Sequence, residues 1–159
     1  MRQISIRPLR PCDAAEIVKW RYLPPYDFYN HPSSGPEAAN HLLQPEYNYH
    51  AMENQVGQLI GFFCLGLDGQ VPGWEYDKSY LDLGMGLAPE LLGKGMGGIC
   101  LQAIFEHLNA SGVNLALRAT VAAWNLRAIR LCSRVGFREI ASFEAPFHCC
   151  FKVLVLEAV

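Results

Sequence analysis

The chain has 159 residues, of which 51% are hydrophobic and 18% charged, and its formal net charge is −2. A chain of this length buries roughly two thirds of its unfolded surface, so residues 1–159 are expected to form a single domain without help from a metal or disulfides. The near-neutral charge and the pI of 6.2 argue against a nucleic-acid partner. No segment reaches the roughly 20 apolar residues of a membrane span. The charged start differs from a signal peptide, so we expect no membrane and a cytoplasmic protein.

The cysteines and histidines lack metal-site spacing. Six cysteines are present without a CxxC pair, and five histidines form neither HxxxH nor HExxH. Because the chain is large enough to build a core, reduced thiols of the cytosol are the better interpretation. Cys149 and Cys150, as neighbours on a strand, would point to opposite faces. We therefore expect no metal.

The first half of the chain predicts short strands and helices separated by prolines. Asp13 and Glu16 have the spacing of a capping box, which indicates a helix that continues to Arg21. Prolines preclude a long regular helix between residues 22 and 49. The elements expected here are a strand at 4–8, a helix at 13–21, a short helix at 37–43, and hairpin strands at 49–53 and 59–67.

The second half predicts strands alternating with two longer helices. Gly84 and Gly86 lie inside an expected strand, where glycine marks a bulge or the close approach of another backbone. The expected elements are strands at 80–87, 113–121, 137–143 and 147–157, and helices at 97–108 and 125–135. No repeat or linker interrupts them, so an α+β domain with a central sheet is the economical assignment.

A glycine-rich turn at residues 91–98 lies between an expected strand and a helix. Unpaired amides and the helix dipole at such a position favour an anion, and glycine lets the backbone approach phosphate oxygens. The alternative is that these glycines only let the helix pack closely on the sheet. A nucleotide P-loop does not fit, because Lys94 is followed by Gly95 rather than Ser or Thr. A dinucleotide fingerprint would lie in a first βαβ unit, not past mid-chain.

A second motif covers residues 121–137, with Asn125 as the helix cap. Together with residues 87–97, it resembles the GNAT-type N-acetyltransferase superfamily. The family pattern is Arg or Gln, x, x, Gly, x, Gly or Ala after a strand and a proline, then Val, Asn, Ala, Leu, Tyr, Gly and Phe downstream. The resemblance covers residues 57–137 most strongly. It implies a central mixed, mostly antiparallel sheet of about seven strands, with the fourth and fifth splayed apart, flanked by about four helices.

The resemblance also implies acetyl-CoA as the co-substrate. The residues that would hold pantetheine through their backbone are Met85, Gly86 and Leu87. The residues whose amides would cradle the pyrophosphate are Leu92, Gly93, Lys94, Gly95, Met96 and Gly97. The residues that would flank the cofactor are Asn125, Ala128 and Leu131. Two positions depart from the pattern: Leu92 replaces the usual Arg or Gln, and Cys132 stands where a tyrosine commonly protonates the departing thiolate.

Acetyl transfer to an amine requires a base for the amine and an acid for the leaving sulfur. Asp82, seven residues before Pro89, is the candidate base; the alternative is a solvated carboxylate at a strand end. Cys132 is the candidate acid, and the alternative is a small buried hydrophobe. Tyr80 is a substitute proton donor or a packed aromatic. Proximity alone, with water protonating the thiolate, would also allow the reaction.

Aromatic and acidic side chains are the candidates for the acceptor site, because they suit a cationic amine. The alternative is that they pack beneath a proline-rich cover. The candidates are Trp20, Tyr22, Tyr26, Asp27, Tyr29 and Trp74.

The sequence thus predicts an acetyl-CoA-dependent N-acetyltransferase that works by direct attack in a ternary complex. The acceptor would be a primary amine of a protein or of an aminoglycoside-like or polyamine-like small molecule. A non-catalytic acyl-CoA-binding module is the alternative, because a tyrosine is missing at position 132. The resemblance leaves a homodimer open, through the apolar strand at 153–156.

Overall fold

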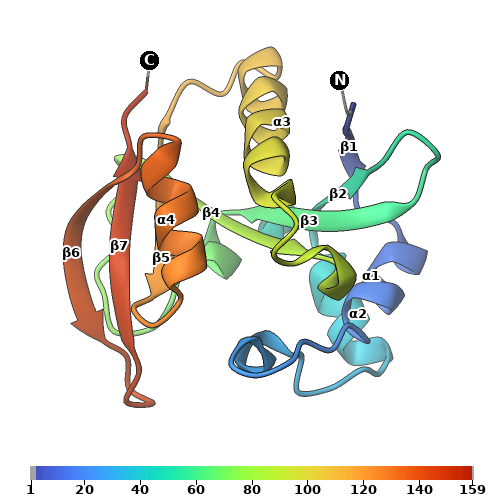
Figure 1. Ribbon diagram of the computed structural model, residues 1–159, viewed down its shortest axis with the longest axis horizontal. Helices are drawn as coiled ribbons and strands as arrows, with labels where there is room; N and C mark the ends of the chain where they lie inside the picture. The colour runs from blue at the N-terminus through green and yellow to red at the C-terminus, as the bar shows by residue number, and fades with distance from the viewer. Residues whose placement is uncertain (1–2, 159) are drawn as a thin grey trace. The chain divides into compact units, whose positions relative to one another are not determined.

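The computed structural model describes residues 3–158 and contains one mixed sheet (Figure 1). The strands of this part of the chain are β1 (Ser5–Pro8), β2 (His50–Glu53), β3 (Leu59–Leu65), β4 (Tyr80–Leu87), β5 (Ala116–Ala122), β6 (Arg138–Glu144) and β7 (Cys150–Leu156). They follow the order β1-β2-β3-β4-β5-β7-β6 in the sheet. β4 and β5 are parallel, whereas β2 pairs antiparallel with β1 and β3, and β7 pairs antiparallel with β5 and β6. The α+β class and the mixed, mostly antiparallel sheet are confirmed.

Within residues 3–158, four α-helices and four short 3-10 helices connect the strands. The α-helices are α1 (Pro11–Ile17), α2 (Pro36–Leu42), α3 (Met96–Ala110) and α4 (Leu126–Arg134). The 3-10 helices are η1 (Tyr26–Tyr29), η2 (Pro45–Tyr47), η3 (Leu67–Gly69) and η4 (Pro89–Leu91). No helix among the described residues is both long enough and apolar enough to cross a membrane.

The chain divides into two compact units that interleave in sequence. The first contains Met1–Phe63 and Met85–Ile104, and the second contains Cys64–Gly84 and Phe105–Val159. β3 and β4 each begin in one unit and end in the other. Because neither unit is a continuous stretch of chain, we keep the single domain over residues 1–159 as a proposal.

In the first unit, α1 and α2 pack against each other (Figure 1), and a hydrophobic core includes residues of both helices. Its buried members are Ala14, Ile17, Val18, Trp20, Leu42 and Ala88. Half-buried aromatic residues close this core, among them Tyr22, Tyr49 and Phe62. Ala88 directly follows β4, so the core supports the end of that strand.

The start and the end of α1 differ from the prediction. Arg10 is the N-cap, and Asp13 lies in the first turn, where its carboxylate accepts hydrogen bonds from the Arg10 amide at 2.8 Å and from Arg7 Nη1 at 2.6 Å. Burial acts to raise the pKa of Asp13, but these hydrogen bonds lower it below its ordinary value. The helix ends at Ile17 instead of Arg21, whose guanidinium donates to backbone carbonyls just beyond the helix.

In the second unit, β7 lies between β5 and β6 and is paired along both edges. Its residues Val153, Leu154 and Val155 are all buried within the chain. Both backbone edges of β7 and the side chains of residues 153–155 are thus taken up within the chain, and a dimer contact along residues 153–156 stays an untested prediction. Homodimerisation through another surface stays a prediction.

Glycines and a helix cap are local features that the sequence of the second half shows directly, and they account for the accurate prediction of its elements. A Cβ on Gly86 would lie 2.5 Å from ring atoms of Phe62, so close approach of a side chain, and not of another backbone as predicted, accounts for this glycine. Asn125 caps α4 by accepting a hydrogen bond from the Ala128 amide at 3.2 Å, as predicted. Gly136, with φ of 106°, follows the end of the same helix.

Candidate active site

The glycine turn joins η4 to α3 in the first unit. Gly93 and Gly95 adopt φ values of 72° and 75°, a conformation that side chains disfavour. A Cβ built on Gly95 would have no heavy atom within 4 Å. Conformation, and not close packing, therefore explains Gly95. The exposed Lys94 lies between the two glycines. An open backbone at the start of a 15-residue helix is a suitable environment for phosphate oxygens.

Near its end, β4 also has backbone groups that point away from β3. The Ala88 amide donates to the Ile60 carbonyl across the β3 side at 2.9 Å. Because backbone groups alternate along a strand, those of Met85 and Leu87 lie on the opposite edge. The parallel ladder to β5 takes in only Tyr80–Asp82 among the described residues. The predicted pantetheine-binding residues thus lie beyond that ladder, where an extended ligand can pair with the backbone.

The Leu87 carbonyl on this edge already has a partner. It accepts a hydrogen bond of 2.6 Å from the hydroxyl of Tyr22, a predicted acceptor-site residue. Sequence reasoning assigned roles to both residues but did not link them, because 65 positions separate them in the chain.

The predicted cofactor residues of α4 belong to the second unit. Asn125 is buried and its side-chain oxygen caps the helix, while Ala128 and Leu131 are half-buried. The structure therefore establishes Asn125 as the cap of α4. The contact of these three residues with a cofactor stays a prediction.

Asp82 is buried, so the alternative of a solvated strand-end carboxylate is wrong. Arg118 donates from Nε to one carboxylate oxygen at 2.6 Å and from Nη2 to the other at 2.8 Å. Gln70 donates to the second oxygen at 3.0 Å. These bonds give Asp82 a clear structural role, and a base function stays a prediction.

Arg118 is a buried charged residue that sequence reasoning missed. Its side chain is 1% exposed, and its guanidinium carbon lies 4.9 Å and 5.6 Å from the ring centroids of Tyr76 and Tyr80. The hydrogen bond with Asp82 raises its pKa above the ordinary arginine value, although burial acts in the opposite direction. Arg118 also donates to the Asp77 carbonyl at 3.0 Å. It therefore holds the loop before β4 against the sheet. The signal in the sequence that could have identified Arg118 is that it stands as a lone arginine in an apolar strand.

The two proton donors considered for the leaving sulfur are differently placed. Cys132 is buried, and burial raises the pKa of its thiol to about 11. A thiol that holds its proton so strongly is a poor acid toward a departing thiolate, since ordinary thiols have a pKa of about 8.5. The Tyr80 hydroxyl donates to Glu157 Oε1 at 3.3 Å. The observed surroundings favour the packing alternative for Cys132.

The predicted acceptor residues divide into buried and exposed groups. Trp20 is buried, and its ring centroid lies 6.1 Å from that of Phe62, so Trp20 is part of the hydrophobic core. Asp27 and Tyr29 are exposed on η1, and Tyr26, on the same element, is half-buried. Trp74, in the second unit, is half-buried and stacks on Phe143 with ring centroids 5.7 Å apart.

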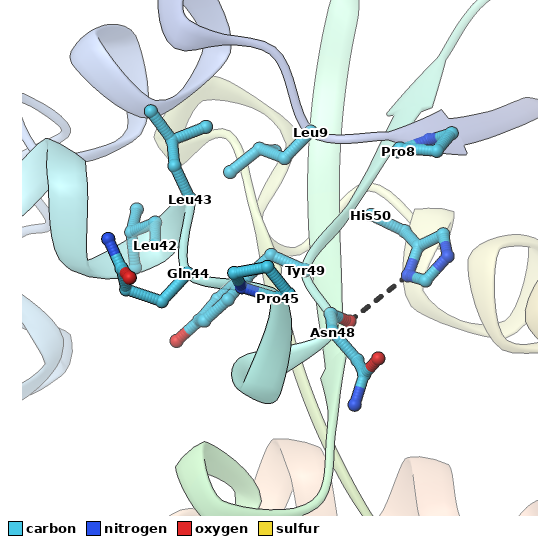
Figure 2. Close-up of a pocket in the computed structure, with 9 residues that line it drawn as sticks. All are labelled: Pro8, Leu9, Leu42, Leu43, Gln44, Pro45, Asn48, Tyr49 and His50. Atoms are coloured by element: carbon cyan, nitrogen blue, oxygen red, sulfur yellow. Dashed lines mark hydrogen bonds between the residues drawn. The ribbon is translucent and has the colours of Figure 1, made fainter.

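The first unit contains a hollow of about 270 Å³, and none of the predicted site residues lines it (Figure 2). It is lined by Pro8, Leu9, Leu42, Leu43, Gln44, Pro45, Asn48, Tyr49 and His50. His50 Nδ1 lies 3.0 Å from the Asn48 carbonyl oxygen, and the His50 ring stacks on Phe63. Neither the glycine turn nor the edge of β4 contributes to this hollow.

A comparison with protein-family models identifies the chain. Residues 14–137 match the model described as the acetyltransferase (GNAT) family, and this region contains both the glycine turn and α4. The chain belongs to the GNAT acetyltransferase family. It is an N-acetyltransferase of this family, whose members bind acetyl-CoA or CoA. No curated protein sequence matches the chain.

Solved structures share the GNAT fold at low sequence identity. The aminoglycoside acetyltransferase AAC(6')-Ib, in complex with coenzyme A and kanamycin, matches with a TM-score of 0.75 and 21% identity, over 98% of this chain and 95% of that one. A spermidine N-acetyltransferase SpeG chimera from Vibrio cholerae and hSSAT matches with a TM-score of 0.71 and 19% identity, over 98% and 95%. The yncA protein from Salmonella typhimurium, with its cofactor acetyl-CoA, matches with a TM-score of 0.64 and 17% identity, over 97% and 93%.

Proposed function

We propose that this GNAT enzyme transfers the acetyl group of acetyl-CoA to a primary amine by direct attack in a ternary complex. The observation that carries the proposal is the glycine turn before α3. Gly93 and Gly95 have positive φ, and the space beside Gly95 is open. This backbone suits pyrophosphate oxygens, and the start of α3 adds partial positive charge.

The remaining cofactor contacts in the proposal follow the strand and the turn. Acetyl-CoA supplies the acetyl group as a thioester. Backbone groups of Met85 and Leu87 pair with pantetheine, because they lie on the edge of β4 opposite β3. The amides of residues 92–97 and the exposed Lys94 receive the pyrophosphate. Asn125, Ala128 and Leu131 are assigned to the flank of the cofactor by the family pattern alone.

The chemistry proposed here relies on position more than on one dedicated acid. A backbone N–H of β4 polarises the acetyl carbonyl, which stabilises the charge that develops on its oxygen. The amine, with an ordinary pKa of about 10, must lose its proton before or during attack. As the carbon–nitrogen bond forms and the carbon–sulfur bond breaks, one water molecule takes the amine proton and another protonates the departing thiolate, so that the sulfur leaves as a thiol.

A cationic amine is the acceptor class that the first unit supports. Phe28 and Tyr29 are 45% and 42% exposed beside the exposed Asp27, and the two rings meet edge to face at 5.1 Å. Aromatic faces and a carboxylate attract an ammonium group. Two similar structures are named for spermidine and for aminoglycosides, both polycationic amines. We therefore place polyamine-like and aminoglycoside-like molecules ahead of protein amines.

An amine screen tests this proposal. The purified protein is mixed with acetyl-CoA and with spermidine, kanamycin or a lysine-containing peptide, and both CoA thiol release and acetylated product are measured. The expected result is equal formation of thiol and acetylated small amine. A folded protein that binds acetyl-CoA but acetylates none of these amines would contradict the proposal.

The cysteines bear on the compartment in which the protein works. None of the six has CxxC spacing, and Cys100 and Cys132 are buried thiols. Because thiols persist where glutathione keeps them reduced, we propose the cytoplasm as the site of action.

A further inference from the structure

We propose that Tyr22 is a positioning residue, which ties the segment 22–30 to the end of β4 and thereby sets the affinity for the amine. The proposal rests on the proposed function, because it takes the exposed side chains of that segment as the amine-binding surface. It assigns Tyr22 a role that differs from direct contact with the acceptor.

The side chain of Tyr22 makes the first half of this link. Its hydroxyl donates to the carbonyl of Leu87, the last residue of β4, at 2.6 Å. Leu87 lies on the edge opposite β3, the same edge that Met85 presents to pantetheine in the proposed function. Tyr22 thus reaches the strand that is proposed to carry the cofactor without occupying its Met85 groups.

The backbone amide of Tyr22 makes the second half of the link. Its amide donates to Asn30 Oδ1 at 2.8 Å, and the Asn30 amide donates to the Asp27 carbonyl at 3.0 Å. These bonds close the segment that contains η1. The exposed Asp27, Phe28 and Tyr29 therefore lie in a loop whose beginning and end both meet at Tyr22.

The surroundings of Tyr22 keep this link intact. The ring packs against the core cluster that includes Trp20 and Ala88. Burial, followed by the nearby negative charge of Glu90, raises the pKa of the Tyr22 hydroxyl to about 12. The hydroxyl accordingly remains protonated at neutral pH and continues to donate to Leu87.

The link also predicts which group of Leu87 serves the cofactor. Its carbonyl accepts from Tyr22, so pantetheine is expected to use the Leu87 amide and the backbone of Met85. Removing the Tyr22 hydroxyl should therefore loosen the loop and leave acetyl-CoA binding nearly unchanged.

The variant Tyr22→Phe tests the link, because it removes one hydroxyl and keeps the ring. Hydrogen exchange of residues 23–31 in the free protein should become faster. With the best amine of the screen, KM should rise about fivefold to tenfold, as expected for one lost hydrogen bond. The kcat and the Kd for acetyl-CoA should each change by less than about twofold. Asn30→Ala, which breaks the backbone half, should shift exchange and KM in the same direction.

Tyr47→Phe is the matched control. Tyr47 lies in the same unit and stacks on His41 with ring centroids 4.2 Å apart, outside the 22–30 segment. It should alter neither exchange at residues 23–31 nor the amine KM.

Unchanged exchange in Tyr22→Phe would overturn the proposal, and so would a large loss of acetyl-CoA affinity. An unchanged KM with faster exchange would also overturn it, because the loop would then not serve the amine. Failure of the proposed function is distinguishable, since it appears in the wild-type protein as absent transfer.

Discussion

The buried pair of Asp82 and Arg118 places two opposite charges in an environment where neither is stable alone. Removal of one member of such a pair costs about 3–5 kcal/mol, because the other charge remains buried without compensation. We expect Asp82→Asn to lower the free energy of unfolding by about 3 kcal/mol, measured by urea denaturation. Asp77→Asn is the control, because it changes an exposed carboxylate near the same guanidinium, 3.5 Å from Nη1, and should have a much smaller effect.

If Asp82 is the catalytic base, its replacement is expected to lower the rate and not the stability. A catalytic base contributes typically 10²- to 10⁴-fold to the rate. An Asp82→Asn variant with nearly unchanged stability and kcat reduced by about a hundredfold would support Asp82 as the base and contradict the structural role.

Cys132 is expected to pack and not to transfer protons. Burial raises the pKa of its thiol to about 11, so proton donation to a thiolate with a pKa of about 8.5 is uphill. We expect Cys132→Ala to retain kcat within about threefold, measured under saturating acetyl-CoA and amine.

Cys100→Ala is the matched control for that measurement. Cys100 is also buried, with a pKa raised to about 11 for the same reason, but no role in catalysis is assigned to it. A fall in kcat of about a hundredfold in Cys132→Ala alone would show that the thiol takes part in the reaction.

At the scale of the elements, the contact between β3 and β4 depends on a missing side chain. A Cβ on Gly86 would lie 2.5 Å from two ring atoms of Phe62, so Gly86→Ala forces one of the strands or the ring to move. We expect a loss of about 1–3 kcal/mol in the free energy of unfolding, measured with urea.

A double-variant cycle with Phe62→Leu separates this clash from other effects. The smaller side chain removes the ring atoms, so Gly86→Ala should cost less in the Phe62→Leu background than alone. Additive losses would show that the ring is not the cause.

Element bounds were predictable where local signals agree. The strand at residues 80–87 and the start of α4 were confirmed, because Asn125 and Gly136 mark the helix ends within a few residues. α1 was wrong at both ends, because Asp13 was interpreted as the cap although Pro11 already begins the helix. The carboxylate of Asp13 also bonds to Arg7, a contact that the spacing of the sequence does not show.

At the scale of the whole molecule, the site was predictable in its local parts only. The glycine turn is contiguous in sequence, and the positive φ of Gly95 follows from its residue type and position. The contacts of Arg118 with Asp82 and of Tyr22 with Leu87 span 36 and 65 positions. They depend on strand register and on the path of the loops, which no local pattern specifies.

The free energy of unfolding at alkaline pH tests the raised pKa values of two buried thiols and of the Tyr22 hydroxyl. Burial raises the pKa of Cys100 and Cys132 to about 11, and burial with Glu90 raises that of Tyr22 to about 12. Their contribution to stability is therefore complete below about pH 9, the ordinary thiol range, and is lost as the pH rises through 11 to 12. Urea denaturation from pH 7 to pH 11.5 should show this decline, and a constant free energy of unfolding across that range would refute the assignment.

The central claim is that the turn before α3 binds acetyl-CoA, and Gly95→Ala tests it against Gly57→Ala. Both glycines have similar φ values, 75° and 77°, and open space for a Cβ, so both variants should carry the same strain of about 1–2 kcal/mol. Gly57 lies in the turn between β2 and β3.

Calorimetric titration with acetyl-CoA is the decisive measurement. We expect wild type and Gly57→Ala to bind with similar Kd, and Gly95→Ala to bind at least about tenfold more weakly, because its amides are redirected. Equal binding by all three proteins, or no binding by folded wild type, would contradict the claim.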